Sequence, residues 1–302
     1  MTTFTTLGTR HNFLGIEKEY SSFAGSQVAI LPVPYERTVS YGTGTKSGPR
    51  AILDASHQVE FYDEETGLEV HRTLGIATLR ALETARLGDE AALEMIHARV
   101  RELLAKKKLI VTLGGEHTLS QAVIAAFAER FRDLSVVQID AHSDLRPEYM
   151  GNKYSHASVM ARVCEFLDPR RLVQIGIRAQ CAEEAQFIKR RRITTMYAHE
   201  IREGKYTRLL KSWDDYAIEN LTEHVYVTFD VDGLDPSVMP STGTPEPNGL
   251  MWNETMRFLR KLGAARRVVG CDIVEFSPIK GLHYPNLTAA RLVSKMINYF
   301  WG

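Results

Sequence analysis

The sequence lacks a surplus of charge of either sign, because lysine plus arginine and aspartate plus glutamate each number 37. A chain without net charge carries no electrostatic footprint for nucleic acid or for an anionic membrane. Long hydrophobic runs are missing too, since no segment approaches the about 20 apolar residues that a membrane-spanning helix needs. The N-terminus, MTTFTTLGTRHNFLGIEKEY, also lacks the apolar stretch of a secretory signal. We therefore expect neither a nucleic-acid partner nor a membrane partner.

Cysteine is scarce and has no spacing typical of a metal site. The chain has three cysteines, Cys164, Cys181 and Cys271, and none belongs to a Cys-x-x-Cys pattern. An odd number of cysteines without a signal sequence favours reduced thiols. We therefore expect a cytoplasmic protein.

Internal repeats, low-complexity tracts and linkers are also absent from the sequence. Its 302 residues, 44% of them hydrophobic and 25% charged, are enough for one large α/β domain, although length alone would also permit two. We expect a single domain over residues 1–302.

Apolar runs typical of strands alternate with segments of helical periodicity. Strands are expected at 28–33, 109–113, 134–139, 172–177, 194–197, 225–229 and 268–274. Helices are expected at 47–53, 88–108, 118–131, 181–191, 205–220, 251–262 and 287–300. This alternation predicts an α/β fold, a single-domain three-layer αβα sandwich with a mostly parallel sheet.

Three polar segments follow such apolar runs: GGEH at 114–117, DAHSD at 140–144 and DVDGLDP at 230–236. Polar residues after a buried strand emerge at its carboxyl end, where open parallel sheets bind ligands. Alternate residues of an extended segment point to the same side, so one strand end offers Asp140, His142 and Asp144 to a common point. Asp230 and Asp232 repeat this arrangement.

Four carboxylates balance the charge of two divalent cations, and a site rich in oxygen with two imidazoles suits Mn²⁺. Ni²⁺, Co²⁺ or Fe²⁺ could replace it. A single Asp-x-Asp is more often a turn or a helix cap, and one histidine is more often a core residue. The segments together favour a metal site, since mutually repelling carboxylates at buried strand ends would be costly without a cation. Gly114 and Gly115 belong to no phosphate-loop or dinucleotide-binding pattern.

The chain resembles the ureohydrolases, that is, the arginases, agmatinases and their relatives. The resemblance extends from PVPY at 32–35 through GGEH and DAHSD to DVDGLDPSVMPSTGTPEPNGL at 230–250 and VEFSP at 274–278. It implies an arginase-like fold, a homo-oligomer (trimer or hexamer) and two Mn²⁺ per subunit. One metal would be held by His117, Asp140, Asp144 and Asp230, and the other by Asp140, His142, Asp230 and Asp232.

The resemblance also implies catalytic roles for residues outside the metal ligands. The metals would turn water into hydroxide, which attacks a guanidinium carbon, and Asp144 would accept a hydrogen bond from it. His156 matches the family's proton shuttle, and a near-neutral pKa would suit that role. Glu275 matches the acid that grips the guanidinium nitrogens, and Thr244 matches a threonine that supports it. The alternative for His156 is a helix-start or surface residue, for Glu275 a surface acid at a strand end, and for Thr244 a turn hydroxyl.

Segment 145–155 lacks the asparagine- and serine-rich arrangement with which arginases hold an α-amino acid, and it resembles the agmatinase branch. The function expected is hydrolysis of agmatine to putrescine and urea. Guanidinobutyrate, aminopropylagmatine and arginine are alternative substrates, and Arg146, Glu148 and Lys153 are candidates for recognising the substrate's tail. An inactive regulatory homologue and a deacetylase-like hydrolase are the competing classes. Glu116, often Asp in this family, and Asn248, commonly Gly, are the two departures from its pattern.

Overall fold

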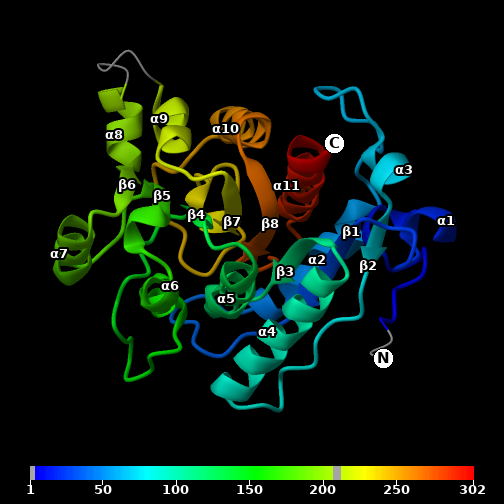
Figure 1. Cartoon of the computed structure of the whole chain (residues 1–302), viewed down its shortest axis with the longest axis horizontal. Helices are drawn as coiled ribbons and strands as arrows, with labels where there is room; N and C mark the ends of the chain where they lie inside the picture. The colour runs from blue at the N-terminus through cyan, green and yellow to red at the C-terminus, as the bar shows by residue number, and fades with distance from the viewer. Residues whose placement is uncertain (1–3, 207–211) are drawn as a thin grey trace.

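A computed structural model describes residues 4–206 and 212–302 of the chain. Within them, eight parallel strands form one sheet in the order β2-β1-β3-β8-β7-β4-β5-β6. The strands are β1 (Val28–Val33), β2 (Ile76–Thr78), β3 (Leu109–Gly114), β4 (Ser135–Ile139), β5 (Leu172–Ile177), β6 (Thr194–Tyr197), β7 (His224–Asp230) and β8 (Arg267–Val274). Figure 1 shows the sheet crossing the molecule from β6 on the left to β2 on the right.

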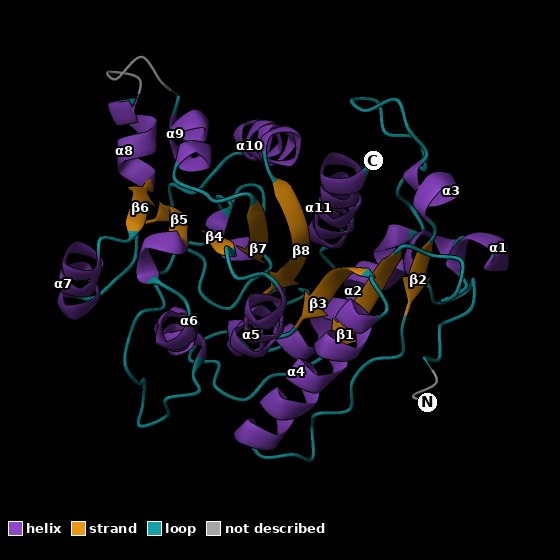
Figure 2. Cartoon of the chain, in the orientation of Figure 1, coloured by secondary structure: helices purple, strands orange, loops and turns teal. Residues whose placement is uncertain are grey.

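Helices cover both faces of this sheet (Figure 2). In Figure 1, α8 to α11 lie above the sheet and α4 to α7 below it, while α2 packs against α11. The helices are α1 (Lys18–Ser21), α2 (Gly48–Ser56), α3 (Val70–Leu74), α4 (Asp89–Ala105), α5 (Ser120–Arg130), α6 (Val159–Phe166), α7 (Ala182–Arg191), α8 (Ala198–Arg202), α9 (Trp213–Glu219), α10 (Trp252–Ala265) and α11 (Tyr284–Trp301). The three-layer αβα prediction is confirmed, and the sheet's paired strands are all parallel.

The apolar core has two halves because the sheet buries side chains on both faces. One half includes Phe258 of α10 and Val293 of α11, and the other includes Val100 of α4 and Phe127 of α5. The contact between α5 and the sheet is close, since a Cβ added to Gly270 of β8 would lie 2.3 Å from the Phe127 ring. No described helix is long and apolar enough to cross a membrane.

All strands expected from the sequence are present, whereas some helices differ from the prediction. The helix expected at 118–131 starts at Ser120, after a 3-10 turn over His117–Leu119. The start predicted for the helix at 205–220 was wrong, because α9 begins at Trp213. Residues 207–211 of that predicted helix lie outside the described part of the chain. The short strand β2 and the helices α1, α3, α6 and α8 were not predicted.

The four central strands place the polar segments beside one another. β3, β8, β7 and β4 are consecutive in the sheet and run in the same direction. Their carboxyl ends therefore meet at one edge, where the residues after each strand converge.

Candidate metal centre

Asp140, the first residue after β4, lies between the two histidines predicted to be ligands. Its Oδ2 is 3.2 Å from His117 Nδ1, and its Oδ1 is 3.7 Å from His142 Nδ1. Gln138 Nε2 donates to Oδ2 over 2.8 Å, and the backbone N–H of His142 donates to Oδ1 over 2.6 Å. The carboxylate thus turns one oxygen toward each histidine, which is the placement a bridging ligand requires.

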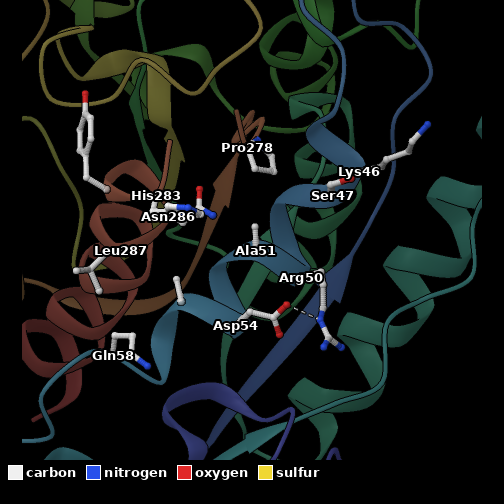
Figure 3. Close-up of a pocket in the computed structure, with 12 residues that line it drawn as sticks. Lys46, Ser47, Arg50, Ala51, Asp54, Gln58, Pro278, His283, Asn286 and Leu287 are labelled. Atoms are coloured by element: carbon white, nitrogen blue, oxygen red, sulfur yellow. Dashed lines mark hydrogen bonds and ion pairs between the residues drawn. The ribbon is translucent and has the colours of Figure 1, made fainter. Parts of the chain in front are cut away.

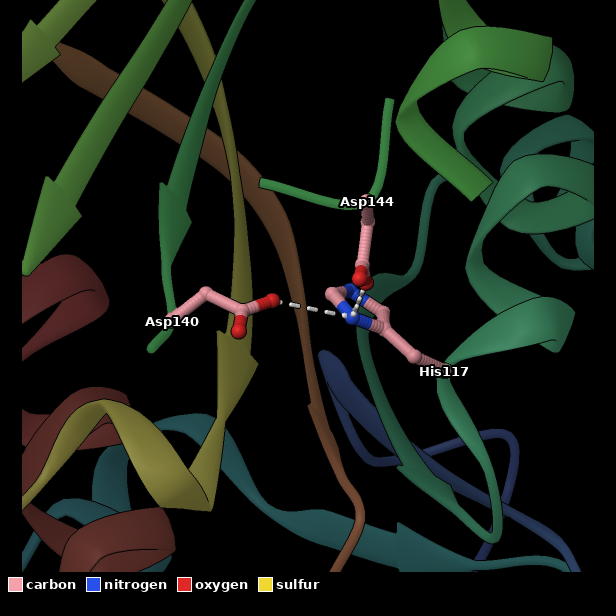
Figure 4. Close-up of side chains that lie close together, drawn as sticks. All are labelled: His117, Asp140 and Asp144. Carbon is pink, nitrogen blue, oxygen red and sulfur yellow. Dashed lines mark ion pairs between the residues drawn. The ribbon is translucent and has the colours of Figure 1, made fainter. Parts of the chain in front are cut away.

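His117 is fully buried after β3, and its Nδ1 faces three carboxylates. Nδ1 lies 3.1 Å from Asp144 Oδ2, 3.2 Å from Asp140 Oδ2 and 3.5 Å from Asp230 Oδ2. Figure 4 shows the side chains of Asp140 and Asp144 pointing toward the His117 ring. Asp144 itself has a left-handed backbone with φ of 54°. Its carbonyl accepts the N–H groups of Met160 and Ala161, so the start of α6 fixes this conformation.

The other ring nitrogen of His117 is held by a chain of buried hydrogen bonds. His117 Nε2 is 2.9 Å from Thr228 Oγ1, and the Thr228 hydroxyl donates to Asp272 Oδ1 over 2.7 Å. Tyr226 donates to the second oxygen of Asp272 over 2.8 Å. Because the Thr228 hydrogen is used on Asp272, Nε2–H is the donor to Thr228, and Nδ1 is the nitrogen left to face the carboxylates.

His142 and Asp232 form a second group around Asp140. His142 Nδ1 is 3.0 Å from Asp232 Oδ2, and Asp232 Oδ1 accepts the Ala141 N–H over 3.0 Å. Asp230 caps the turn after β7 by accepting the Asp232 N–H over 2.9 Å. The side chain of His142 is 26% exposed, so this group lies nearer to solvent than His117 does.

The buried charges of the cluster shift several pKa values. Burial and the charge of Asp140 raise the pKa of Asp144 to about 7. Burial and the charges of Asp232 and Asp140 raise the pKa of Asp230 well above its usual range. Burial opposes the charged form of His142, but Asp232 and Asp140 outweigh it and raise the pKa of His142 to about 12. The protein alone therefore accommodates its four carboxylates by keeping protons among them.

The cluster fits a pair of divalent cations. The atoms of His117, Asp140 and Asp144 form one group whose members lie within 4.8 Å of one another, and those of Asp140, His142 and Asp232 form another. His117 Nδ1 is buried and has no hydrogen-bond partner of good geometry among the described residues. In the metal-free protein, burial opposes the charged form of His117, but Asp140 and Asp144 outweigh it and raise the pKa of His117 well above its usual range, so a cation that binds Nδ1 would take the place of a proton. Asp140 belongs to both groups, and its role as a bridging ligand stays a prediction. Asp230 joins the first group through its 3.5 Å approach to His117, and its role as a second bridge stays a prediction.

Glu275 follows β8 and lies beside the first group. Its Oε1 accepts the His117 backbone N–H over 2.6 Å, and its own N–H donates to the Gly115 carbonyl over 2.9 Å. Its backbone is left-handed, with φ of 60°. Its other carboxylate oxygen, Oε2, makes no hydrogen bond within the described ranges. Thr244 is half-buried in the loop whose Thr242 pairs with Phe276, next to Glu275.

His156 stands in a 3-10 turn before α6, half-buried at the edge of the cluster. Its Nδ1 is 3.2 Å from Thr38 Oγ1, and its ring packs edge-on against Tyr149 with the centroids 5.8 Å apart. Burial, together with the imidazolium charges of His142 and His117, lowers the pKa of His156 to about 4. This value is lower than the near-neutral pKa expected from the sequence, because the ring is largely enclosed by protein.

The three candidates for tail recognition have different surroundings. Arg146 Nε lies 3.8 Å from Glu184 Oε2, with the guanidinium over the Tyr149 ring. Lys153 lies 3.9 Å from Glu90 Oε1. Glu148 is exposed and makes no ion pair or hydrogen bond within residues 4–206 and 212–302.

Sequence reasoning missed Thr228, Asp272 and Thr38. Two of them could have been found from the sequence. Asp272 lies inside the apolar strand RVVGCDIV and needs a buried partner, and Thr228 lies on the same face of its strand as Asp230. No pattern in the sequence indicates Thr38, because its contact with His156 joins residues 118 positions apart.

A large cavity lies away from this cluster. It has a volume of about 830 Å³ and lies between α2 and the start of α11, where Arg50 pairs with Asp54 over 2.8 Å (Figure 3). None of the predicted site residues lines it. Cavity size alone therefore does not locate the chemistry of this chain.

Comparison with known proteins assigns the class. The family model described as "Arginase family" matches residues 26–298. The N(1)-aminopropylagmatine ureohydrolase of Synechocystis sp. is 37% identical over 93% of this chain and 91% of its own length. The agmatinase of Bacillus anthracis is 32% identical over 87% of each chain. The crystal structure of agmatine ureohydrolase of Thermoplasma volcanium matches with a TM-score of 0.82 and 29% identity, covering 99% of this chain and 95% of that one.

These relatives are hydrolases acting on guanidino groups, and the chain is an enzyme of this class. It belongs to the arginase family. The predicted resemblance to ureohydrolases and the arginase-like fold are both confirmed.

Proposed function

We propose that this enzyme releases urea from a guanidinoalkyl amine that lacks an α-carboxylate, either agmatine or agmatine extended by an aminopropyl group. The observation that carries the proposal is the position of Glu275, a buried carboxylate with one oxygen on the His117 N–H and the other without a hydrogen-bond partner in the described part of the chain. A planar guanidinium with paired N–H donors suits such an acceptor. The cluster next to it supports hydrolysis as the reaction.

The protein's residues have separate tasks in this proposal. When two divalent cations are bound, they lower the pKa of water and supply a nucleophile at neutral pH. Glu275 orients the guanidinium, and Thr244 supports it from the neighbouring loop. His156 carries a proton to the departing amine, without which the tetrahedral species does not release urea.

Charge around the tail segment favours a cationic substrate tail. Arg146 and Lys153 already lie near Glu184 and Glu90, whereas Glu148 is exposed and unpaired within the described residues. Glu148 also adjoins Tyr149, which packs against His156. An ammonium group is attracted to such a carboxylate, whereas the carboxylate of arginine or guanidinobutyrate is repelled. The sequence alone favoured agmatine as the substrate. The relatives named N(1)-aminopropylagmatine ureohydrolase, which are 36–37% identical to this chain, support the extended substrate instead.

Urea release from agmatine, N1-aminopropylagmatine, guanidinobutyrate and arginine tests the proposal. We expect kcat/KM for arginine to be about 10³-fold below that of the better cationic substrate, because its carboxylate lacks a partner in the pocket. Glu148→Gln is expected to raise KM for the extended substrate by about fivefold, the effect of one exposed ion pair. Glu165→Gln makes the same change in net charge on α6 and is the matched control. Arginine turned over as well as either cationic substrate would refute the assignment.

We also propose that the cofactor is two Mn²⁺ per subunit, that the chain forms one domain over residues 1–302, and that it works as a cytoplasmic homo-oligomer. The oxygen-rich donor set supports manganese. Metal analysis of the purified protein and its mass in solution test these points.

A further inference from the structure

Glu116 is fully buried between the strand end that carries His117 and the loop after β1. Its carboxylate accepts four hydrogen bonds. Oε2 accepts the N–H groups of Arg37 and, over 2.7 Å, Thr38. Oε1 accepts the hydroxyl groups of Thr38 and Thr118, each over 2.7 Å. Glu116 is therefore tied to Arg37 and Thr38, and each of its four hydrogen-bond partners within the described ranges is a donor.

Thr38 connects this carboxylate to His156. The His156 backbone N–H donates to Thr38 Oγ1 over 3.1 Å, and His156 Nδ1 lies 3.2 Å from the same oxygen. A hydroxyl has one hydrogen, and here a carboxylate at 2.7 Å competes for it with an imidazole nitrogen at 3.2 Å. The charged acceptor makes the stronger hydrogen bond, so the Thr38 hydrogen lies toward Glu116.

The orientation of the Thr38 hydroxyl determines which His156 nitrogen is protonated. With its hydrogen on Glu116, Thr38 Oγ1 offers only lone pairs to His156. Nδ1 must then carry the hydrogen, and Nε2 keeps its lone pair. The competing donors are weak, because Ser155 Oγ is 3.5 Å from Nδ1 and Ser40 Oγ is 3.5 Å from Nε2.

We propose that Glu116 is a positioning residue that acts through the Thr38 hydroxyl to hold His156 with its hydrogen on Nδ1 and with Nε2 free to take up and pass on a proton. The same logic governs hydrolases in which a buried acid fixes the tautomer of a catalytic histidine. The length of the side chain matters, since an aspartate at this position would withdraw the carboxylate by one methylene from Thr38. The consequence for turnover rests on the proposed function, whereas the tautomer does not.

Nitrogen NMR of the full chain with ¹⁵N-labelled histidine tests the tautomer, with Zn²⁺ added because it lacks the unpaired electrons that broaden signals near Mn²⁺. The His156 signal is identified by its loss in His156→Gln. We expect the hydrogen on Nδ1 in the unmodified protein and in Thr38→Ser, and on Nε2 in Thr38→Val. Glu116→Asp is expected to populate both tautomers. Thr118→Val removes a donor from the same Glu116 oxygen, but Thr118 does not contact His156. The tautomer of His156 in this variant should therefore match that in the unmodified protein.

Turnover supplies the second measurement. Thr38→Val is expected to lower kcat by about 10²-fold with little change in KM, and Thr38→Ser should restore most of it. A hydrogen on Nε2 in the unmodified protein, or an unchanged tautomer in Thr38→Val or in Glu116→Asp, overturns the inference. A protein with the expected tautomers that releases no urea from any guanidino compound refutes the proposed function instead.

Discussion

Thr228→Val is a sharp test of how the protein prepares His117 for a metal. Valine has nearly the shape of threonine, so the substitution removes the hydroxyl and leaves β7 packed as before. The His117 Nε2–H then loses its acceptor at 2.9 Å, and Asp272 loses the donor at 2.7 Å while keeping Tyr226. His117 is fully buried, so no solvent replaces the lost partner.

Two effects of known size follow. Loss of a partner that orients a metal-binding histidine costs about 10- to 100-fold in metal affinity. At about 1.4 kcal/mol per tenfold, that is about 1.4–2.8 kcal/mol of binding free energy. The unpaired buried N–H also lowers the free energy of unfolding of the metal-free protein by about 1–3 kcal/mol. Both changes have the same sign, so the loaded variant is destabilised more than the metal-free one.

Calorimetric titration of Mn²⁺ into the metal-free protein measures the affinity of each site, and thermal unfolding measures stability. Thr228→Ser retains the hydroxyl and should bind as the unmodified protein does. Tyr226→Phe removes a hydrogen bond from the far oxygen of Asp272 without touching His117, so its affinity should change by less than the 10-fold expected for Thr228→Val. If Thr228→Val binds its first metal ion with unchanged affinity, the hydrogen-bond chain behind His117 has no part in metal binding.

Three other outcomes are expected. Asp232→Asn should weaken the metal ion nearer to His142 and abolish most turnover, and metal analysis showing two tightly held ions with normal activity contradicts that assignment. His156→Ala should keep both ions while kcat falls about 10²-fold, whereas an unchanged pH–rate profile would remove this histidine from the mechanism. Burial opposes the charged form of Asp214, but hydrogen bonds from Ser212 and Arg257 outweigh it and lower the pKa of Asp214 in the folded protein. The charged carboxylate therefore stabilises the fold above the ordinary carboxyl pKa, and this stabilisation is lost as pH falls through the lower pKa of the folded state. Asp214→Asn should therefore destabilise the protein by about 2 kcal/mol near neutral pH and by less near pH 3, and equal losses of thermal stability at both pH values would disprove the effect.

Local patterns in the sequence predicted most of the sheet and the ligand candidates. The strands β3, β4, β7 and β8 are predominantly apolar, because a parallel sheet buries both of its faces. Asp140, His142 and Asp144 were identified from spacing within five residues, which reflects backbone geometry that needs no tertiary information.

The parts that could not be predicted depend on contacts between distant segments. Helix α6 is short, and its start is fixed by the Asp144 carbonyl rather than by a strong periodicity. The link from Glu116 through Thr38 to His156 joins three loops that only the fold brings together. At α9 a usable local signal was overlooked, because Ser212 caps the helix by accepting the Asp215 N–H.

The order of strands in the sheet has a consequence for biosynthesis. β7 and β8 lie between β3 and β4 although they are made last, so the two halves of the sheet become continuous only when those strands are in place. Glu275 and His117, which are hydrogen-bonded in the folded protein, are 158 residues apart along the chain. A chain that ends before β8 already contains all six candidate metal ligands, but it lacks the strand between β3 and β7 and the Glu275 that follows it. The hydrogen bond between Glu275 and the His117 backbone can therefore form only after nearly the whole chain has been made.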